Sequence, residues 1–208
     1  MKKNIMLRKF YKEDALALEN IIRKTWNYDA FCSPATAARL AHVYLYSCLS
    51  NQTFTRVAIV DGKPCGIIMA KNIQKHRCPF FLKLHSLLAI VRLLITREGR
   101  QVCSFYGSIS DMDQELLNSS DKTYQGELAF FALDEAMRGM GIGRQLFTAA
   151  HTYMKQENIQ NFFLYTDSSC SYGFYAHQGM QRRGERNTVV NFAGQQVPMQ
   201  FFLYDAVC

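Results

Sequence analysis

The chain has 208 residues, 49% of them hydrophobic and 20% charged, and a formal net charge of +7; this predicts a globular protein with one large domain or two small ones and argues against a disordered or fibrous protein. The seven cysteines form no CxxC pair and no zinc-ligand spacing with histidine, so we expect reduced thiols in the cytoplasm and no metal site. The basic excess favours anionic partners, but the basic clusters are short and lack interleaved aromatic residues, so we expect no nucleic acid partner.

The first half of the chain predicts a strand, two helices and a hairpin. The N-terminal residues lack the long apolar stretch of a signal peptide, and residues 4–10 alternate as expected of an opening strand. An amphipathic helix follows. Ser33 before Pro34 predicts the start of a second helix, because serine caps helices and proline suits the first helical position. Asp61 and Gly62 then lie between two apolar runs, which is a strong hairpin signal.

Residues 79–96, PFFLKLHSLLAIVRLLIT, predict a helix with one wide apolar face. Lys83 and Arg92 interrupt the segment, which is shorter than the ~20 apolar residues needed to cross a bilayer, so we expect no stable membrane insertion. We favour a face that is buried in the fold or packed against a partner over one that lies on a membrane surface. Residues 110–126 are predicted to form a polar stretch with one short helix.

From residue 126 onward, strands and helices alternate clearly. Residues 126–136 predict a strand, residues 141–159 a helix and residues 161–167 another strand, an order that implies a crossover connection and parallel pairing of the two strands. A short helix over 171–178 and two final strands joined through 191–194 complete the chain. The order of elements predicts a single mixed α/β domain over residues 1–208.

Three glycines, Gly139, Gly141 and Gly143, follow Arg138 at the start of the predicted helix. A helix N-terminus presents free N–H groups and the positive end of the helix dipole, and glycine lets an anion approach them closely. Arg144 adds a second positive charge, so the turn predicts a binding site for a phosphate or diphosphate. The spacing fits neither a GxGxxG dinucleotide motif nor a P-loop, because no GK[ST] follows.

The segment RGMGIG, residues 138–143, resembles the [QR]-x-x-G-x-[GA] signature of the GNAT acyltransferase superfamily, with its arginine and last two glycines at the defining positions. The preceding ELAFFAL is similar to the family strand before this turn. FYAHQGM, residues 174–180, resembles F-Y-x-x-x-G-F with methionine in place of the last aromatic residue. The resemblance covers most of the chain except residues 71–125, an insertion where relatives have a much shorter connection.

The resemblance implies a mixed, largely antiparallel central sheet, splayed at a parallel strand pair and flanked by helices, with a helical insertion before the fourth strand. It also implies acetyl-CoA as the co-substrate, bound where the parallel strands part. The strand would hold the pantetheine arm and the glycine turn the pyrophosphate, while Ser168 stands where many relatives have asparagine. By position, the cofactor-binding residues would be Phe131, Ala132, Leu133, Arg138, Gly139, Met140, Gly141, Ile142, Gly143, Arg144, Ser168 and Ser171.

Acyl transfer to an amine needs a neutral amine and a proton for the departing thiolate. Because an amine with a pKa near 10.4 is protonated at neutral pH, a positioned base accelerates the reaction. The resemblance implies Glu127 as this base, with a solvated glutamate at a strand start as the alternative. It implies Tyr175 as the general acid, with a tyrosine that only packs on the sheet as the alternative. The expected activity is acetyl-CoA-dependent N-acetylation of a small-molecule or peptide amine.

Several alternatives remain open at this point. The same fold could bind CoA or acyl-CoA without turnover, as a sensor or interaction module, or it could transfer a longer acyl group or acylate a hydroxyl. Cys170 has no histidine and acid partners evident in sequence, so we expect a packed thiol and not a nucleophile. Residues 79–121 are predicted to build a lid or acceptor pocket, and the apolar helix within them could instead form a homodimer interface.

Overall fold

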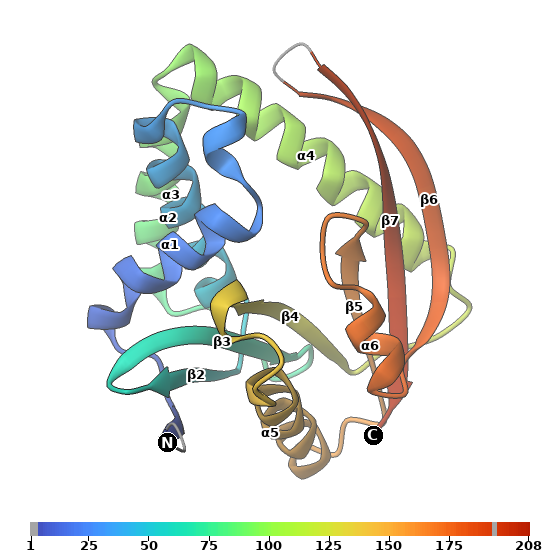
Figure 1. The fold of residues 1–208 in the computed structure, drawn as a ribbon. Coiled ribbons are helices and arrows are strands. Elements are labelled where there is room, and N and C mark those ends of the chain that lie inside the picture. The colour runs from blue at the N-terminus through green and yellow to red at the C-terminus, as the bar shows by residue number, and fades with distance from the viewer. Residues whose placement is uncertain (1–3, 193–194) are drawn as a thin grey trace.

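The computed structural model describes residues 4–192 and 195–208, whose strands form one seven-stranded sheet in the order β1-β2-β3-β4-β5-β7-β6 (Figure 1). The strands are β1 (Ile5–Arg8), β2 (Phe54–Val60), β3 (Lys63–Asn72), β4 (Gly126–Leu133), β5 (Asn161–Asp167), β6 (Gln181–Phe192) and β7 (Gln195–Val207). The helices are α1 (Ala15–Thr25), α2 (Pro34–Ser50), α3 (Phe80–Leu94), α4 (Arg97–Asn118), α5 (Ile142–Gln156) and α6 (Gly173–His177). The predicted mixed α/β order is confirmed; residues 193–194, in the predicted connection between the last two strands, lie outside the described residues.

Local signals position the elements of the first half as predicted. Ser33 caps α2 by accepting a hydrogen bond from the Thr36 N–H at 3.4 Å, and Pro34 occupies the first turn. Asp61 and Gly62 have φ values of 50° and 79°, which is the backbone that a two-residue hairpin turn requires. β2 and β3 pair antiparallel on either side of that turn. The predictions for this helix start and this hairpin are confirmed.

The sheet opens between the parallel strands β4 and β5. They pair at only two positions, Gly126 with Phe162 and Glu127 with Phe163. Beyond Glu127 the two strands separate, while β5 continues to pair with β7 along its whole length. The splayed parallel pair that the resemblance implies is therefore confirmed.

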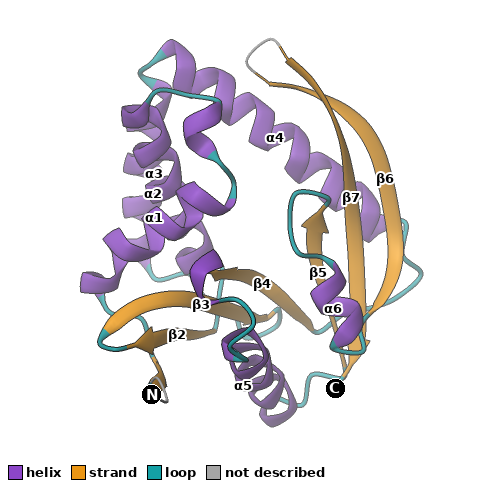
Figure 2. Ribbon diagram, in the orientation of Figure 1, coloured by secondary structure: helices purple, strands orange, loops and turns teal. Residues whose placement is uncertain are grey.

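Helices cover both faces of the sheet (Figure 2). On one face, α1 and α2 pack against β3 and β4, in a core that includes Leu18, Leu45 and Phe130. On the other face, α5 packs against β2, β3 and β4. Its buried residues recur at helical spacing, and they include Ile142, Leu146, Ala150 and Met154.

α3 lies on the outside of the helical layer and packs mainly against α2 (Figure 1). The predicted helix is confirmed. Its apolar face is not buried within the fold, so of the placements considered from the sequence, packing against a partner and contact with a membrane surface remain. Its buried residues are Ser86, Ala89 and Leu93, whereas seven of its large apolar side chains are exposed. Periodicity shows that one face of a helix is apolar, but it does not show what covers that face.

α4 differs from the short helix predicted in a polar stretch, because it is one continuous helix of 22 residues. Val102 in its first half belongs to the core of the helical layer. Leu116 in its second half packs with residues of β5 and β7, including Phe163 and Leu203. α4 therefore crosses the gap where β4 and β5 separate and contacts both halves of the molecule (Figure 1).

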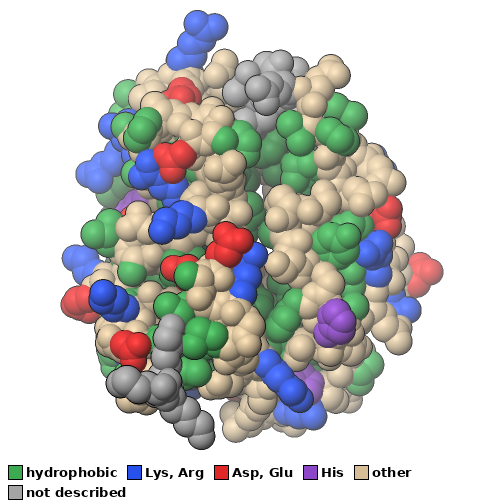
Figure 3. Space-filling view, viewed as in Figure 1, with side chains coloured by type: hydrophobic (Ala, Val, Ile, Leu, Met, Phe, Trp, Pro, Cys, Tyr) green, Lys and Arg blue, Asp and Glu red, His purple; other side chains and the backbone are tan. Residues whose placement is uncertain are grey.

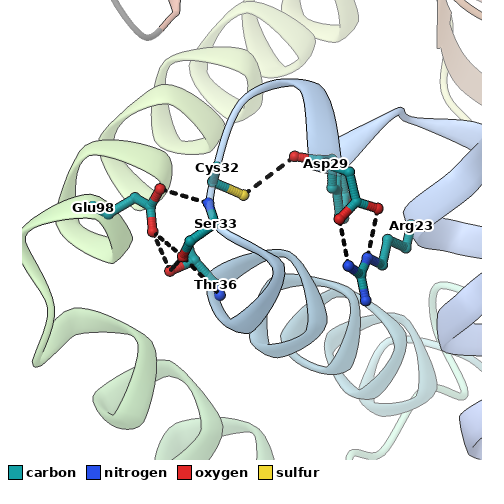
Figure 4. A network of polar contacts seen from close by, with 7 residues as sticks. Arg23, Asp29, Cys32, Ser33, Thr36 and Glu98 are labelled. Carbon is teal, nitrogen blue, oxygen red and sulfur yellow. Dashed lines mark hydrogen bonds and ion pairs between the residues drawn. The ribbon is translucent and has the colours of Figure 1, made fainter.

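Glu98, in the first turn of α4, ties this helix to the N-terminus of α2 (Figure 4). Its carboxylate accepts hydrogen bonds from the Ser33 N–H at 2.7 Å, from the Ser33 hydroxyl at 2.6 Å and from the Thr36 hydroxyl. The neighbouring Gly99 lies so close to α3 that a Cβ atom would stand 1.9 Å from the carbonyl oxygen of Leu93. The corner between α3 and α4 therefore has no space for a side chain at residue 99.

Candidate active site

The glycine turn forms an open N-terminus for α5. Gly139 and Gly141 adopt φ values of 77° and 74°, a left-handed backbone that glycine adopts without strain. The first helical hydrogen bond runs from the Gln145 N–H to the Gly141 carbonyl at 3.1 Å, so the preceding N–H groups have no acceptor within the helix. Apart from the adjoining residues, no atom of the described part of the chain lies within 4 Å of a Cβ atom placed on Gly139 or Gly141. The turn is thus uncovered on the side from which an anion would approach.

Two arginines flank this turn and point into an exposed region. Arg144 lies in the first turn of α5, which contains no acidic residue, and a cation at this end of a helix is disfavoured by the helix dipole. Among the described residues, Arg138 pairs with the exposed Glu135 at a long distance of 3.9 Å, and such surface pairs contribute little. An anion bound at the turn would offset the unfavourable position of Arg144.

The edge of β4 that faces β5 is free of strand pairing from residue 128 onward. On its other edge β4 pairs with β3 through Phe131, Ala132 and Leu133, and one extra β4 residue after Glu127 forms a bulge. The first turn of α5 lies against this part of β4, because a Cβ atom on Gly143 would stand 3.5 Å from the Phe131 side chain and 3.7 Å from the Leu133 side chain. The structure therefore brings the predicted pantetheine strand and the predicted pyrophosphate turn together.

α6 is held against this same region by aromatic contacts. The Phe174 ring lies 5.5 Å from that of Phe131 on β4 and 5.9 Å from that of Phe147 on α5, measured between centroids. Gly179, which ends the α6 turn, has a φ of 85°. This conformation explains the glycine of the FYAHQGM segment, and buried Met180 occupies the position of the family aromatic residue.

Tyr175 of α6 packs between the rings of Phe174 and Tyr204, with centroid distances of 5.6 and 6.1 Å. Burial raises its pKa well above the ordinary value of 10, and the nearby Cys170 and Asp167 raise it further. The phenol is therefore protonated at neutral pH, which is the state that a proton donor needs.

Glu127 occupies the last position at which β4 pairs with β5. Its side chain is 16% exposed, and the Lys71 ammonium lies 3.6 Å from its carboxylate. Burial raises the pKa of Glu127, and the positive charge of Lys71 partly opposes this change. The side chain is thus not the solvated strand-start glutamate of the alternative interpretation, while its role as a base stays a prediction.

Asp113 of α4 lies close enough to Asp167 and Glu127 to be affected by their charges, and the sequence predicts no role for it in the site. Burial, with the charges of Asp167 and Glu127, raises its pKa to about 7. Asp113 follows Tyr106 by seven residues, so the two lie on one face of α4, and the charge of Asp167 also raises the pKa of Tyr106. Helical spacing places Asp113 on the same face as Tyr106, but no local signal shows that this face lies near Glu127 and Asp167.

Ser168, Cys170 and Ser171 lie on the loop between β5 and α6. Ser168 is bound to β7, because its hydroxyl accepts a hydrogen bond from the Gln200 N–H at 3.1 Å. The Ser171 carbonyl accepts from the Phe174 N–H at 3.0 Å, at the start of α6. Burial raises the pKa of Cys170 to about 11, helped by Asp167. A thiol with this pKa is protonated at neutral pH, in keeping with a packed cysteine and not a nucleophile.

The opening reaches the surface of the molecule. In the orientation of Figure 1, a narrow furrow separates the half that carries the N-terminal helices from the half that carries α6 and β6 (Figure 3). No group of three or more histidine, cysteine or acidic side chains is placed to hold a metal ion within residues 4–192 and 195–208. In the described part of the chain, every helix is too short or too polar to cross a bilayer.

A sequence model of the acetyltransferase (GNAT) family matches residues 17–180. No curated protein matches the sequence. Solved structures with the same fold include ribosomal-protein-alanine N-acetyltransferase from Brucella melitensis (14% identity, 98% of this chain and 99% of that chain covered, TM-score 0.57). They also include a GNAT-family acetyltransferase from Streptococcus pneumoniae (14%, 98% and 99%, 0.54) and PaiA N-acetyltransferase from Thermoplasma acidophilum in complex with coenzyme A (17%, 99% and 99%, 0.50).

Proposed function

Because the chain belongs to the GNAT acetyltransferase family, we propose that it transfers an acetyl group from acetyl-CoA to the amine of an acceptor. The observation that carries this proposal is the open glycine turn at the start of α5, which lies beside the free edge of β4. A structure with this fold, PaiA from T. acidophilum, was solved with coenzyme A, which supports the same ligand here.

In this proposal the diphosphate of the co-substrate is bound at the glycine turn. The N–H groups of Ile142, Gly143 and Arg144 donate to its oxygens, and the guanidinium groups of Arg138 and Arg144 add charge-assisted hydrogen bonds. The left-handed Gly139 and Gly141 let the backbone pass close to the phosphates.

The pantetheine arm extends along the free edge of β4 toward the splay. Within residues 131–133, the backbone groups that face the free edge are suited to its two amides, because alternate residues of a strand present their N–H and C=O groups to the same edge. Ser168 and Ser171 on the loop after β5 contribute polar groups from the opposite half. Met140 packs beneath the turn against the α5 core.

The amine nitrogen attacks the thioester carbonyl carbon, the C–S bond breaks, and CoA leaves as a thiol after it gains a proton. Glu127 accepts the proton of the acceptor ammonium, directly or through water, and its raised pKa makes it a stronger base. Tyr175 donates its proton to the departing sulfur. It regains a proton from the attacking nitrogen, which loses one as it becomes the amide. Both residues act by holding or moving a proton at the splay.

The acceptor in this proposal is a cationic small molecule or peptide amine. Carboxylates from three elements, Asp113 of α4, Glu127 of β4 and Asp167 of β5, lie close enough for their charges to influence one another. A positively charged acceptor would be attracted to this group of carboxylates although the chain carries a net positive charge.

Calorimetric titration with CoA and acetyl-CoA, with thiol release measured against a panel of amines, tests the proposal. Gly141→Trp should abolish binding at the turn. Gly62→Trp is the matched control, since both glycines have positive φ and open space around them. Binding with thiol release supports an acetyltransferase, and binding without release for every amine favours the non-catalytic CoA-binding module. Absence of binding to the wild-type chain contradicts the proposal.

A further inference from the structure

α3 presents a continuous apolar surface to solvent. Seven of its large apolar side chains, and that of the residue after it, are between 38% and 79% exposed, whereas Leu82 and Ile90 are partly buried and Leu93 is buried. We refer to this set as the α3 stripe: Phe80, Phe81, Leu84, Leu87, Leu88, Val91, Leu94 and Ile95. Contiguous exposed apolar surface of this kind marks an interaction site in a soluble domain.

The α3 stripe is fixed in its outward position by the opposite side of the helix. Ser86, Ala89 and Leu93 are buried there, and the Ser86 hydroxyl donates to the Tyr46 carbonyl of α2 at 3.1 Å. The small residues let α3 pack closely on α2. At 100° per residue the stripe falls on the side of the helix away from these contacts, so the stripe is not part of the core.

Basic residues border the α3 stripe, and acidic ones are missing from the segment around it. By helical periodicity Lys83 lies at one margin of the stripe and Arg92 at the other, and both are exposed. Arg77 precedes the helix, Arg97 follows it, and the sequence contains no Asp or Glu from residue 62 to residue 97. An apolar face with lysine and arginine at its margins is the pattern of a helix that lies in a lipid interface.

We propose that the α3 stripe docks the protein on the surface of an anionic lipid bilayer, with α3 parallel to the membrane plane. The apolar side chains enter the boundary between headgroups and acyl chains, while Lys83 and Arg92 contact the anionic headgroups. A helix of 15 residues is about 22 Å long and cannot cross a hydrocarbon core of ~30 Å, so α3 lies on the membrane and does not span it. This inference is independent of the acetyl transfer proposed above.

Charge favours a lipid surface over a second copy of the chain as the occupant. Two copies paired through the stripe would bring two sets of the same basic side chains together, because a two-fold interface uses the same patch on both subunits. Residues 62–97 offer no carboxylate to neutralise them. An anionic bilayer supplies both the apolar phase and the opposite charge.

Co-sedimentation of the full chain with vesicles tests the proposal, using phosphatidylcholine alone and phosphatidylcholine mixed with phosphatidylglycerol. We expect binding to the mixed vesicles, reduced by salt and by omission of the anionic lipid. The double substitution Phe81→Ser/Leu88→Ser should weaken binding at least about tenfold, and Lys83→Glu/Arg92→Glu should do the same. Leu16→Ser is the matched control, because Leu16 on α1 is 70% exposed but lies outside the stripe.

Circular dichroism and thermal unfolding should be unchanged in all of these variants, because each replaced side chain is exposed. Failure of the wild-type chain to bind mixed vesicles overturns the proposal, as does binding that Phe81→Ser/Leu88→Ser leaves intact. Sedimentation velocity supplies a third outcome. A wild-type dimer that this double substitution dissociates would assign the stripe to a second copy and would equally overturn the lipid assignment.

Discussion

Lys71 and Glu127 face each other on neighbouring strands, with the ammonium nitrogen 3.6 Å from a carboxylate oxygen and directly paired backbones. The base must be deprotonated, so activity should fall as the pH drops through the pKa of Glu127, which lies above its ordinary value of 4.5. Removal of the positive charge in Lys71→Met should move this acid limb of kcat/KM to higher pH. Lys75→Met, which removes a surface pair with Glu157, is the control for Lys71→Met. An unmoved acid limb in Lys71→Met would count against Glu127 as the base.

Glu127→Gln should lower kcat by about 10²–10⁴-fold, because it removes the proposed base.

Tyr175→Phe should lower kcat by about 10²-fold, because it removes the proton donor but keeps the ring that packs on Phe174 and Tyr204. The Kd for acetyl-CoA and the unfolding temperature should stay unchanged. Tyr172→Phe is the control, since Tyr172 packs on Phe202 at 4.9 Å at the start of the same helix. Equal kcat values for the two variants would assign Tyr175 a packing role only.

Asp113→Asn should raise the KM for a cationic acceptor by about tenfold while the KM for acetyl-CoA stays unchanged, because one unit of negative charge is lost from the acceptor side of the opening. Since burial and neighbouring charges raise the pKa of Asp113 to about 7, the wild-type acceptor KM should fall as the pH rises through 7, and the variant should lose this dependence. Asp111→Asn, an exposed change on the same helix, serves as the control. An amine that is uncharged at the assay pH and is acetylated with the same KM as a cationic amine would contradict the proposed acceptor class.

Glu98→Ala should lower the free energy of unfolding by about 1–3 kcal/mol, because it removes the acceptor for the Ser33 and Thr36 donors. These hydrogen bonds hold the pKa of Glu98 below its ordinary 4.5. The contribution is therefore present above the unfolded pKa and is lost as the pH falls through the lower folded pKa, so the two proteins should converge in stability at acidic pH. Urea unfolding at several pH values measures this, with the exposed Glu135→Ala as a control that should change little.

Gly99→Ala and Gly107→Ala form a pair with opposite expected signs. A methyl group at residue 99 would stand 1.9 Å from the Leu93 carbonyl oxygen, so the corner between α3 and α4 must shift, at a cost of about 1–3 kcal/mol or more. Gly107 lies within the same helix with nothing within 4 Å, and alanine there should stabilise by about 0.5–1 kcal/mol. Thermal unfolding of both variants distinguishes a tight corner from a general preference of α4 for alanine.

The glycine turn shows which part of the site could be predicted from sequence. Its glycines, its arginines and the following amphipathic helix are neighbours along the chain, so short spacings carry the information. The same holds for the cap at Ser33 and the hairpin at Asp61, both of which the structure confirms.

α4 shows where the prediction failed and why. Apolar residues recur every three or four positions from Val102 to Leu116, as in one long helix. The polar residues from 110 onward instead favour a polar stretch with one short helix, which divides this pattern. No local sequence signal indicates that one end of the helix packs in the core of the helical layer and the other against β5 and β7. The placement of Asp113 opposite Glu127 depends on that crossing, so the acidic group could not be predicted from spacing along the chain.

The crossing of α4 also bears on the size of the group that can be transferred. Two residue pairs join β4 to β5, so strand pairing alone would let the two halves of the sheet hinge apart. A helix anchored at Val102 in one core and at Leu116 in the other acts as a strut across that hinge. A longer acyl chain that needs a wider gap must first loosen one of these anchors, and the slow amide hydrogen exchange of α4 would report that loosening. We therefore expect the insertion to disfavour long acyl groups, through the rigidity of α4 and not through contact with the acyl chain.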